Sequence, residues 1–155
     1  MQTRSDKVKL YIKEGLPIQE PEIHIKCKKI DDRLQVVIDR LQLSTQTVTV
    51  KKDSAIHKLA LEDIYYFESV DDKVFACCEV DVYETSYKLY EIEEQVSEFS
   101  FARISKSVIV NINMIQSIKP QLNGRFEAML SNNERQIVSR HYVSGLRDKF
   151  IGGVR

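Results

Sequence analysis

The sequence predicts a mainly β protein, built of small β-sheets with one or two short helices and preceded by a small β/α extension at its N-terminus. Between residues 47 and 139, short runs of alternating or apolar side chains recur at close intervals, as they do in strands. Pairs of Asp or Asn follow several of these runs, which is typical of tight turns. Helical spacing of apolar residues is confined to a few segments.

The size and composition of the chain allow one main hydrophobic core. The chain has 155 residues, of which 43% are hydrophobic, and this suits one domain with a small appended lobe. We expect residues 1–47 to form the extension and residues 48–155 the main domain. No run approaches the roughly 18 apolar residues of a membrane span, and charges interrupt residues 1–15, where a signal peptide needs an apolar stretch. The sequence therefore predicts a cytoplasmic protein.

The N-terminal extension is expected to contain two short strands and a helix. Residues 8–12 and 22–27 alternate in the manner of half-buried strands. Residues 30–43 carry apolar side chains at helical spacing, and Asp31 and Asp32 suit the positive end of the helix dipole. The apolar stripe is too small to form a core alone, so it needs a cover from the main domain or from a second subunit.

Most of the main domain is expected to form strands, with two helical segments at 87–98 and 139–150. The runs with strand character are 47–51, 56–61, 63–70, 73–79, 80–86, 125–130 and 135–139. Turns are expected at Asp71-Asp72, Asn123-Gly124 and Asn132-Asn133. The consecutive aromatic residues Tyr65, Tyr66 and Phe67 lie within a strand, which favours a place in the core over stacking on bases.

No pattern in the sequence indicates an enzyme, and neither a cofactor nor a small-molecule substrate is expected. A phosphate-binding glycine loop is lacking, and the histidines His24, His57 and His141 are far apart in the chain. The cysteines Cys27, Cys77 and Cys78 are odd in number and lack metal-ligand spacing. A thiol enzyme would need a histidine or a cation beside Cys77 or Cys78 to lower the thiol pKa, and the sequence offers no obvious partner.

The charge of the chain is distributed unevenly, although its formal net charge is zero. Residues 1–50 carry +2, residues 51–100 carry −8 and residues 101–155 carry +6. Basic side chains that share a face attract phosphates even in a neutral molecule, because screening limits exposed charges to about 8 to 10 Å. Ordinary solvated lysine and arginine residues explain the same count equally well.

Residues 101–113, FARISKSVIVNIN, have the composition of a loop that enters a DNA groove. Arg and Lys contact phosphates and guanine, while Ser and Asn supply short hydrogen-bonding side chains. The alternative is a turn whose Ser and Asn side chains satisfy neighbouring backbone groups, and this reading is favoured for Asn111 and Asn113.

Several spaced motifs in the main domain closely resemble the LytTR family, the DNA-binding output domain of many bacterial response regulators. They are Phe-Glu-Ser before a charged turn, Phe-x-Arg-Ile-Ser-Lys-Ser followed by Ile-Val-Asn, and Val-Ser-Arg-x-Tyr near the end, and the match covers about residues 48–151. The resemblance implies small β-sheets stacked in a row. It also implies binding through loops, with side chains entering successive major grooves of bent DNA.

By motif position, the resemblance implies three contacting loops. Their residues are Asp72, Lys73 and Val74, then Ser105 and Lys106, then Arg140 and His141. Lys106 and Arg140 are the foremost candidates for base contacts, because cations read guanine N7 and O6. Arg103 is a candidate either for a phosphate contact or for a structural role. Val74 departs from the polar residue of some relatives, so Lys73 is expected to act in its place.

The resemblance also implies partners. It implies double-stranded DNA with repeated promoter half-sites, a homodimer at least on DNA and, for stand-alone regulators with a short extension, an inhibitory membrane protein. A receiver domain needs over a hundred residues and does not fit in residues 1–47, so control by its phosphorylation is not expected. The runner-up function is a protein interaction module of the same fold, with the acidic middle third as its working surface.

Overall fold

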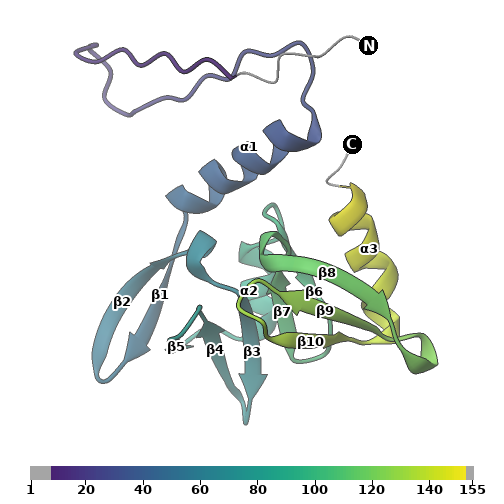
Figure 1. Ribbon diagram of the computed structural model, residues 1–155. Coiled ribbons are helices and arrows are strands. Elements are labelled where there is room, and N and C mark those ends of the chain that lie inside the picture. The colour runs from purple at the N-terminus through teal and green to yellow at the C-terminus, as the bar shows by residue number, and fades with distance from the viewer. Residues whose placement is uncertain (1–7, 153–155) are drawn as a thin grey trace, which may run out of the picture.

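The computed structural model describes residues 8–152, which form two antiparallel sheets with α-helices around them (Figure 1). The larger sheet has the strand order β2-β1-β5-β4-β3-β7-β6. Its strands are β1 (Thr47–Lys52), β2 (Ala55–Ala60), β3 (Tyr66–Val70), β4 (Lys73–Cys77), β5 (Val82–Thr85), β6 (Phe101–Arg103) and β7 (Val108–Asn111). The smaller sheet, in the order β10-β9-β8, contains β8 (Ile115–Pro120), β9 (Phe126–Leu130) and β10 (Arg135–Val138). The predicted mainly β class is therefore confirmed.

The helices are few and short, as predicted. The α-helices are α1 (Asp32–Thr45), α2 (Leu89–Gln95) and α3 (Val143–Gly152), and the 3-10 turns are η1 (Leu61–Asp63), η2 (Ile112–Met114), η3 (Leu122–Gly124) and η4 (Arg140–Tyr142). α1 begins after Asp31, whose carboxylate accepts a hydrogen bond of 2.8 Å from the Leu34 N–H and so satisfies a free donor of the first turn. Among the residues that the structure describes, no helix is both long and apolar enough to cross a membrane.

Tight turns fix the register of the sheets. Asp71 and Asp72 both have positive φ, and Val70 pairs with Lys73 across them. This is the backbone of a two-residue hairpin turn, which Asp tolerates better than most residues. Asn133 has a φ of 68° in the turn between β9 and β10. The three predicted turns are confirmed, but the one at Asn123-Gly124 is longer than two residues, because β8 ends at Pro120 and β9 begins at Phe126.

The interior contains two apolar clusters, one on each side of the larger sheet's centre. The first joins α2 and Leu43 of α1 to the larger sheet and includes Phe67. The second lies among the larger sheet, the smaller sheet and α3, and it includes Tyr65 and Tyr66. The predicted core role of these aromatic residues is confirmed. The Tyr66 hydroxyl donates a 2.7 Å hydrogen bond to Glu134 of the smaller sheet's side, so the two sheets are joined by a polar contact as well.

The extension before α1 differs from its prediction. Residues 8–31 contain no strand, and every one of them is exposed, so the strands predicted at 8–12 and 22–27 are wrong. Alternation produces a strand only where a neighbouring strand supplies hydrogen bonds and a core covers the apolar face. Neither is present for this segment among the described residues, and it lies away from the sheets, beyond α1, at the top of Figure 1.

Candidate nucleic-acid interface

Backbone hydrogen bonds join the three loops that the sequence motifs single out. These loops are the tip of the β3–β4 hairpin, the β6–β7 loop at 104–107 and the segment after β10 at 139–142. The Ser69 N–H of the hairpin donates to the Ser107 carbonyl at 2.8 Å, and the Ser139 N–H donates to the Ile104 carbonyl, also at 2.8 Å. The β6–β7 loop is thus the centre of a continuous surface, which we call the loop surface.

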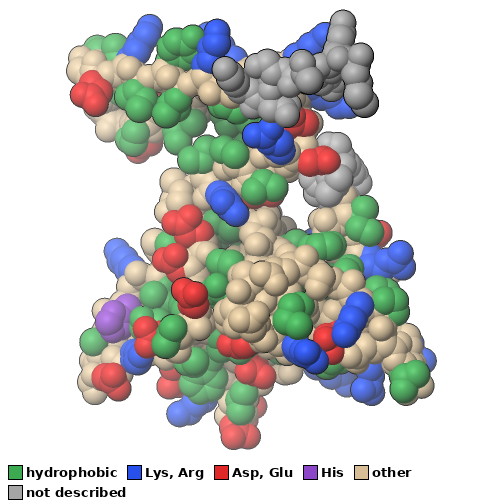
Figure 2. Space-filling model, in the orientation of Figure 1, with side chains coloured by type: hydrophobic (Ala, Val, Ile, Leu, Met, Phe, Trp, Pro, Cys, Tyr) green, Lys and Arg blue, Asp and Glu red, His purple; other side chains and the backbone are tan. Residues whose placement is uncertain are grey.

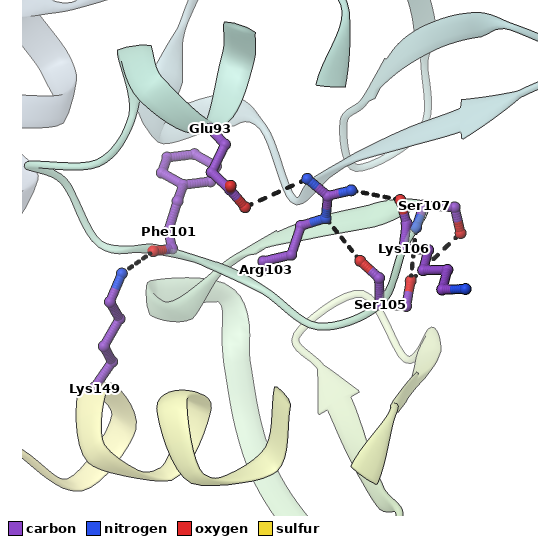
Figure 3. A network of polar contacts seen from close by, with 7 residues as sticks. All are labelled: Glu93, Phe101, Arg103, Ser105, Lys106, Ser107 and Lys149. Atoms are coloured by element: carbon purple, nitrogen blue, oxygen red, sulfur yellow. Dashed lines mark hydrogen bonds and ion pairs between the residues drawn. The ribbon is translucent and has the colours of Figure 1, made fainter. Parts of the chain in front are cut away.

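The Arg103 side chain organises the β6–β7 loop (Figure 3). Its Nε donates to the Ser105 carbonyl at 2.7 Å, and its Nη2 donates to the Lys106 carbonyl at 2.5 Å. Nη1 lies 3.4 Å from the Glu93 carboxylate on α2, and only 21% of the Arg103 side chain is exposed. A guanidinium held on three sides has little of its surface left for another ligand. Of the two predicted roles, these contacts favour the structural one.

The side chains of the β6–β7 loop differ in what they contact. The Ser105 and Ser107 hydroxyls lie 3.3 Å apart, and the Ser107 N–H donates to the Ser105 hydroxyl at 3.2 Å. Lys106 is exposed, and Figure 3 shows its ammonium group without a hydrogen bond to the residues drawn. Arg103 therefore holds the backbone on either side of Lys106, while the Lys106 ammonium extends from it.

A groove of about 890 Å³ lies on the loop surface. It is lined by Ser105, Asn123, Arg125, Ile137, Ser139, Arg140 and His141. Three predicted site residues are therefore brought together here, namely Ser105, Arg140 and His141. Arg125 and Asn123 were assigned no role from the sequence. A second cation directly after an Asn-Gly turn in the basic third of the chain is the signal that points to them. The lining residues include no carboxylate, so the groove favours an anionic ligand.

The first loop differs in character from the other two. Lys73 lies at the start of β4, where its Nζ is 3.8 Å from Glu84 on the neighbouring strand. Asp71 and Asp72 form the tip, and Figure 2 shows acidic side chains gathered over this hairpin. Val74 is only 3% exposed and belongs to the first apolar cluster. The departure at Val74 therefore has a structural reason, since this position faces the core.

Asn111 satisfies backbone groups, as its alternative reading predicts, whereas the buried side-chain amide nitrogen of Asn113 has no hydrogen-bond partner among the described residues. Asn111 is fully buried, and its amide donates to the Ile64 carbonyl at 2.9 Å. Its carboxamide oxygen accepts from the Asn113 N–H at 3.1 Å. Asn111 thereby fastens β7 to the segment before β3.

α3 is also joined to the larger sheet by a polar contact. The Lys149 ammonium of α3 donates a 2.9 Å hydrogen bond to the carbonyl of Phe101, at the start of β6 (Figure 3).

The cysteines are poorly suited to nucleophilic chemistry. Burial raises the pKa of both the Cys77 and the Cys78 thiol to about 11, so both are almost entirely protonated near neutral pH, and the thiolate is the reactive form. Within residues 8–152, no three His, Cys, Asp or Glu side chains are grouped so as to hold a metal ion.

Comparison with known proteins agrees with this architecture. An HTH-type transcriptional regulator of Staphylococcus aureus is 27% identical over 132 residues, which cover 84% of this chain and 89% of that protein. The sensory transduction protein LytT of Bacillus cereus is 31% identical over 143 residues, which cover 84% of this chain but 56% of that protein. The solved LytTr DNA-binding domain of a methyl-accepting/DNA response regulator from Bacillus cereus superposes with a TM-score of 0.64 at 30% identity, covering 68% of this chain and 96% of that one. Residues 54–151 match the LytTr DNA-binding domain family, and the chain therefore belongs to that family.

Proposed function

We propose that this protein is a sequence-specific transcriptional regulator that binds double-stranded promoter DNA by inserting side chains of the loop surface into successive major grooves. Family membership and the names of its relatives support a DNA-binding regulator. The observation that carries the finer proposal is the backbone connection of the three loops, with a groove between two of them that contains arginine and histidine but no carboxylate.

The residues of the loop surface divide into two roles in this proposal. Lys106 and Arg140 read base edges, because an exposed cation on a fixed backbone reaches guanine N7 and O6. Ser105, His141 and Lys73 fix the position of the protein on the duplex through phosphate and sugar contacts. Lys73 contributes least, since Glu84 and the acidic tip of its hairpin offset its charge.

Selection of bound sequences from a random duplex pool at physiological salt tests the proposal. We expect enrichment of a repeated half-site that outcompetes random DNA by roughly a thousandfold or more. The spacing of the two half-sites would give the separation of the two bound domains. Recovery of unrelated sequences with equal affinity would contradict sequence-specific recognition.

Salt dependence separates this function from the runner-up, a protein interaction module that uses the acidic face. Neutralising phosphates releases counterions, so the logarithm of DNA affinity should fall with the logarithm of salt concentration with a slope of about −0.9 per phosphate contacted. Association with a protein through an apolar surface would respond only weakly to salt.

The extension is proposed to pair with a second copy of the chain. Among residues 8–30, nine large apolar side chains are between 41% and 82% exposed, and Figure 2 shows apolar side chains along this segment. Burying them would remove an area on the order of the ~800 Å² that each partner contributes to a stable interface. An inhibitory membrane protein is the alternative occupant of this segment.

Light scattering of the full chain tests this pairing. We expect a mass of twice the 18.0 kDa of one chain, falling to one chain when Ile23 and Ile25 are both replaced by aspartate. Gln19→Asp is the matched control, because it adds a charge to the same segment without removing an apolar side chain. A single-chain mass at every concentration, in wild type and variants alike, would contradict pairing through the extension.

A further inference from the structure

The turn between β8 and β9, residues 121–125, reaches the groove from the smaller sheet. The Gln121 N–H donates to the Arg125 carbonyl at 2.7 Å, which closes the turn. Asn123 and Gly124 both have left-handed backbone, with φ of 63° and 73°. Asn123 and Arg125 line the groove together with Ser105, Arg140 and His141. Parts of the chain that are not adjacent in sequence thus form one basic wall.

Gly124 packs directly against the side chain of Arg140. A Cβ atom at Gly124 would lie 2.9 Å from the Cδ and 3.0 Å from the Cγ of Arg140, which is too close for carbon atoms in contact. The stem of Arg140 therefore lies on bare backbone that only glycine provides. The left-handed φ also favours glycine here. The close approach is a second, independent requirement, because asparagine tolerates this φ but its Cβ would still clash with the Arg140 side chain.

The two arginine residues of the groove differ in what holds them. Arg140 has Gly124 against its stem, and no hydrogen bond or ion pair ties its guanidinium to another residue of the described chain. Arg125 is exposed on the turn and likewise lacks a carboxylate partner among the residues described. Both positive charges are thus available to a ligand, and the Arg140 stem packs against the Gly124 backbone.

We propose that the β8–β9 turn is a fourth DNA-contacting element, in which Arg125 binds a backbone phosphate and Gly124 directs Arg140 toward the base edge. This proposal rests on the proposed function. We assign a phosphate to Arg125 because no described contact orients its guanidinium. Attraction of a cation to a phosphate needs less exact geometry than a bidentate hydrogen bond to a base. Gly124 is a positioning residue, since it acts only through Arg140.

Binding measurements on the selected site and on random duplex, over a range of salt concentrations, test the two parts. Arg125→Ala should weaken binding to both duplexes by the same factor and make the salt slope shallower by about 0.9, as expected for one lost phosphate contact. Leu122→Ala is the control from the same turn, because Leu122 is 86% exposed and does not line the groove.

Gly124→Asn tests the positioning role with the least backbone strain, since asparagine tolerates the left-handed region. The preference for the selected site over random duplex should narrow by about 5- to 150-fold, which is the range for one lost bidentate base contact. In an Arg140→Ala background the same substitution should narrow it no further, because the two residues act as a pair. Circular dichroism confirms that each variant is folded before its affinity is compared.

Two failures are distinguishable. If the wild-type chain discriminates the selected site while Arg125→Ala leaves the salt slope unchanged and Gly124→Asn leaves the preference unchanged, the role of the turn is wrong and the proposed function stands. If Gly124→Asn does not fold, the slope measured for Arg125→Ala alone decides the phosphate contact. A wild-type chain without any sequence preference overturns the proposed function and this inference with it.

Discussion

An Arg140→Ala variant is expected to bind the selected site about 1 to 3 kcal/mol more weakly than the wild-type protein and to accept other bases at one position of the site. The reason is that Arg140 is exposed on a groove without carboxylates and packs its stem against Gly124. A guanidinium so directed matches the paired acceptors N7 and O6 of guanine. Titration of the selected duplex and of its single-base variants measures the effect.

The matched control for this prediction is Arg147→Ala. Arg147 lies on α3 in the same basic third of the chain, with its guanidinium 5.7 Å from the centre of the Phe126 ring, and it does not line the groove. Its removal changes the net charge by the same amount, so both duplexes should respond alike and only slightly. Equal losses on selected and random DNA for Arg140→Ala would refute its assignment to base reading.

The fold of the main domain follows largely from local sequence features. The Asp71-Asp72 turn is foreseeable because Asp tolerates positive φ and two-residue turns require it. The burial of Tyr66 and Phe67 on opposite sides of β3 follows from their consecutive places in an apolar strand between two covered faces. These features depend on residues that are neighbours in the chain, so they can be predicted from the sequence.

Prediction from the sequence fails where contacts between residues far apart in the chain determine the structure. The alternation of residues 8–12 suits a strand, but no sheet edge among the described residues pairs with it. Arginine is a residue type that often contacts phosphate, so the sequence left this role open for Arg103. The two carbonyl groups that bind its guanidinium come together only in the folded loop. Gly124 lies between β8 and β9, and Arg140 follows β10, so their contact cannot be predicted from the spacing of residues in the sequence.

An Arg103→Ala variant is expected to have the second large effect, through loss of the loop's shape. The substitution removes two hydrogen bonds to carbonyls and the contact with Glu93. Hydrogen bonds from a charged donor contribute about 1.5 to 3 kcal/mol each when buried, and less here because the side chain is partly exposed. We expect the free energy of unfolding to fall by about 1 to 3 kcal/mol. Chemical denaturation of the two proteins measures the change.

The effect of Arg103→Ala on DNA recognition separates its two predicted roles. A loop without its guanidinium no longer fixes Ser105 and Lys106, so preference for the selected site should fall by about 10- to 100-fold, and Arg103→Lys should not restore it, because an ammonium cannot replace the planar fork. Glu93→Gln is the control, since it weakens only the longest of the three contacts. The opposite result would be an unchanged free energy of unfolding and an unchanged preference for the selected site, with affinity for every duplex reduced by the same factor and a salt slope shallower by about 0.9. In that case Arg103 binds phosphate, and its contacts within the loop are incidental.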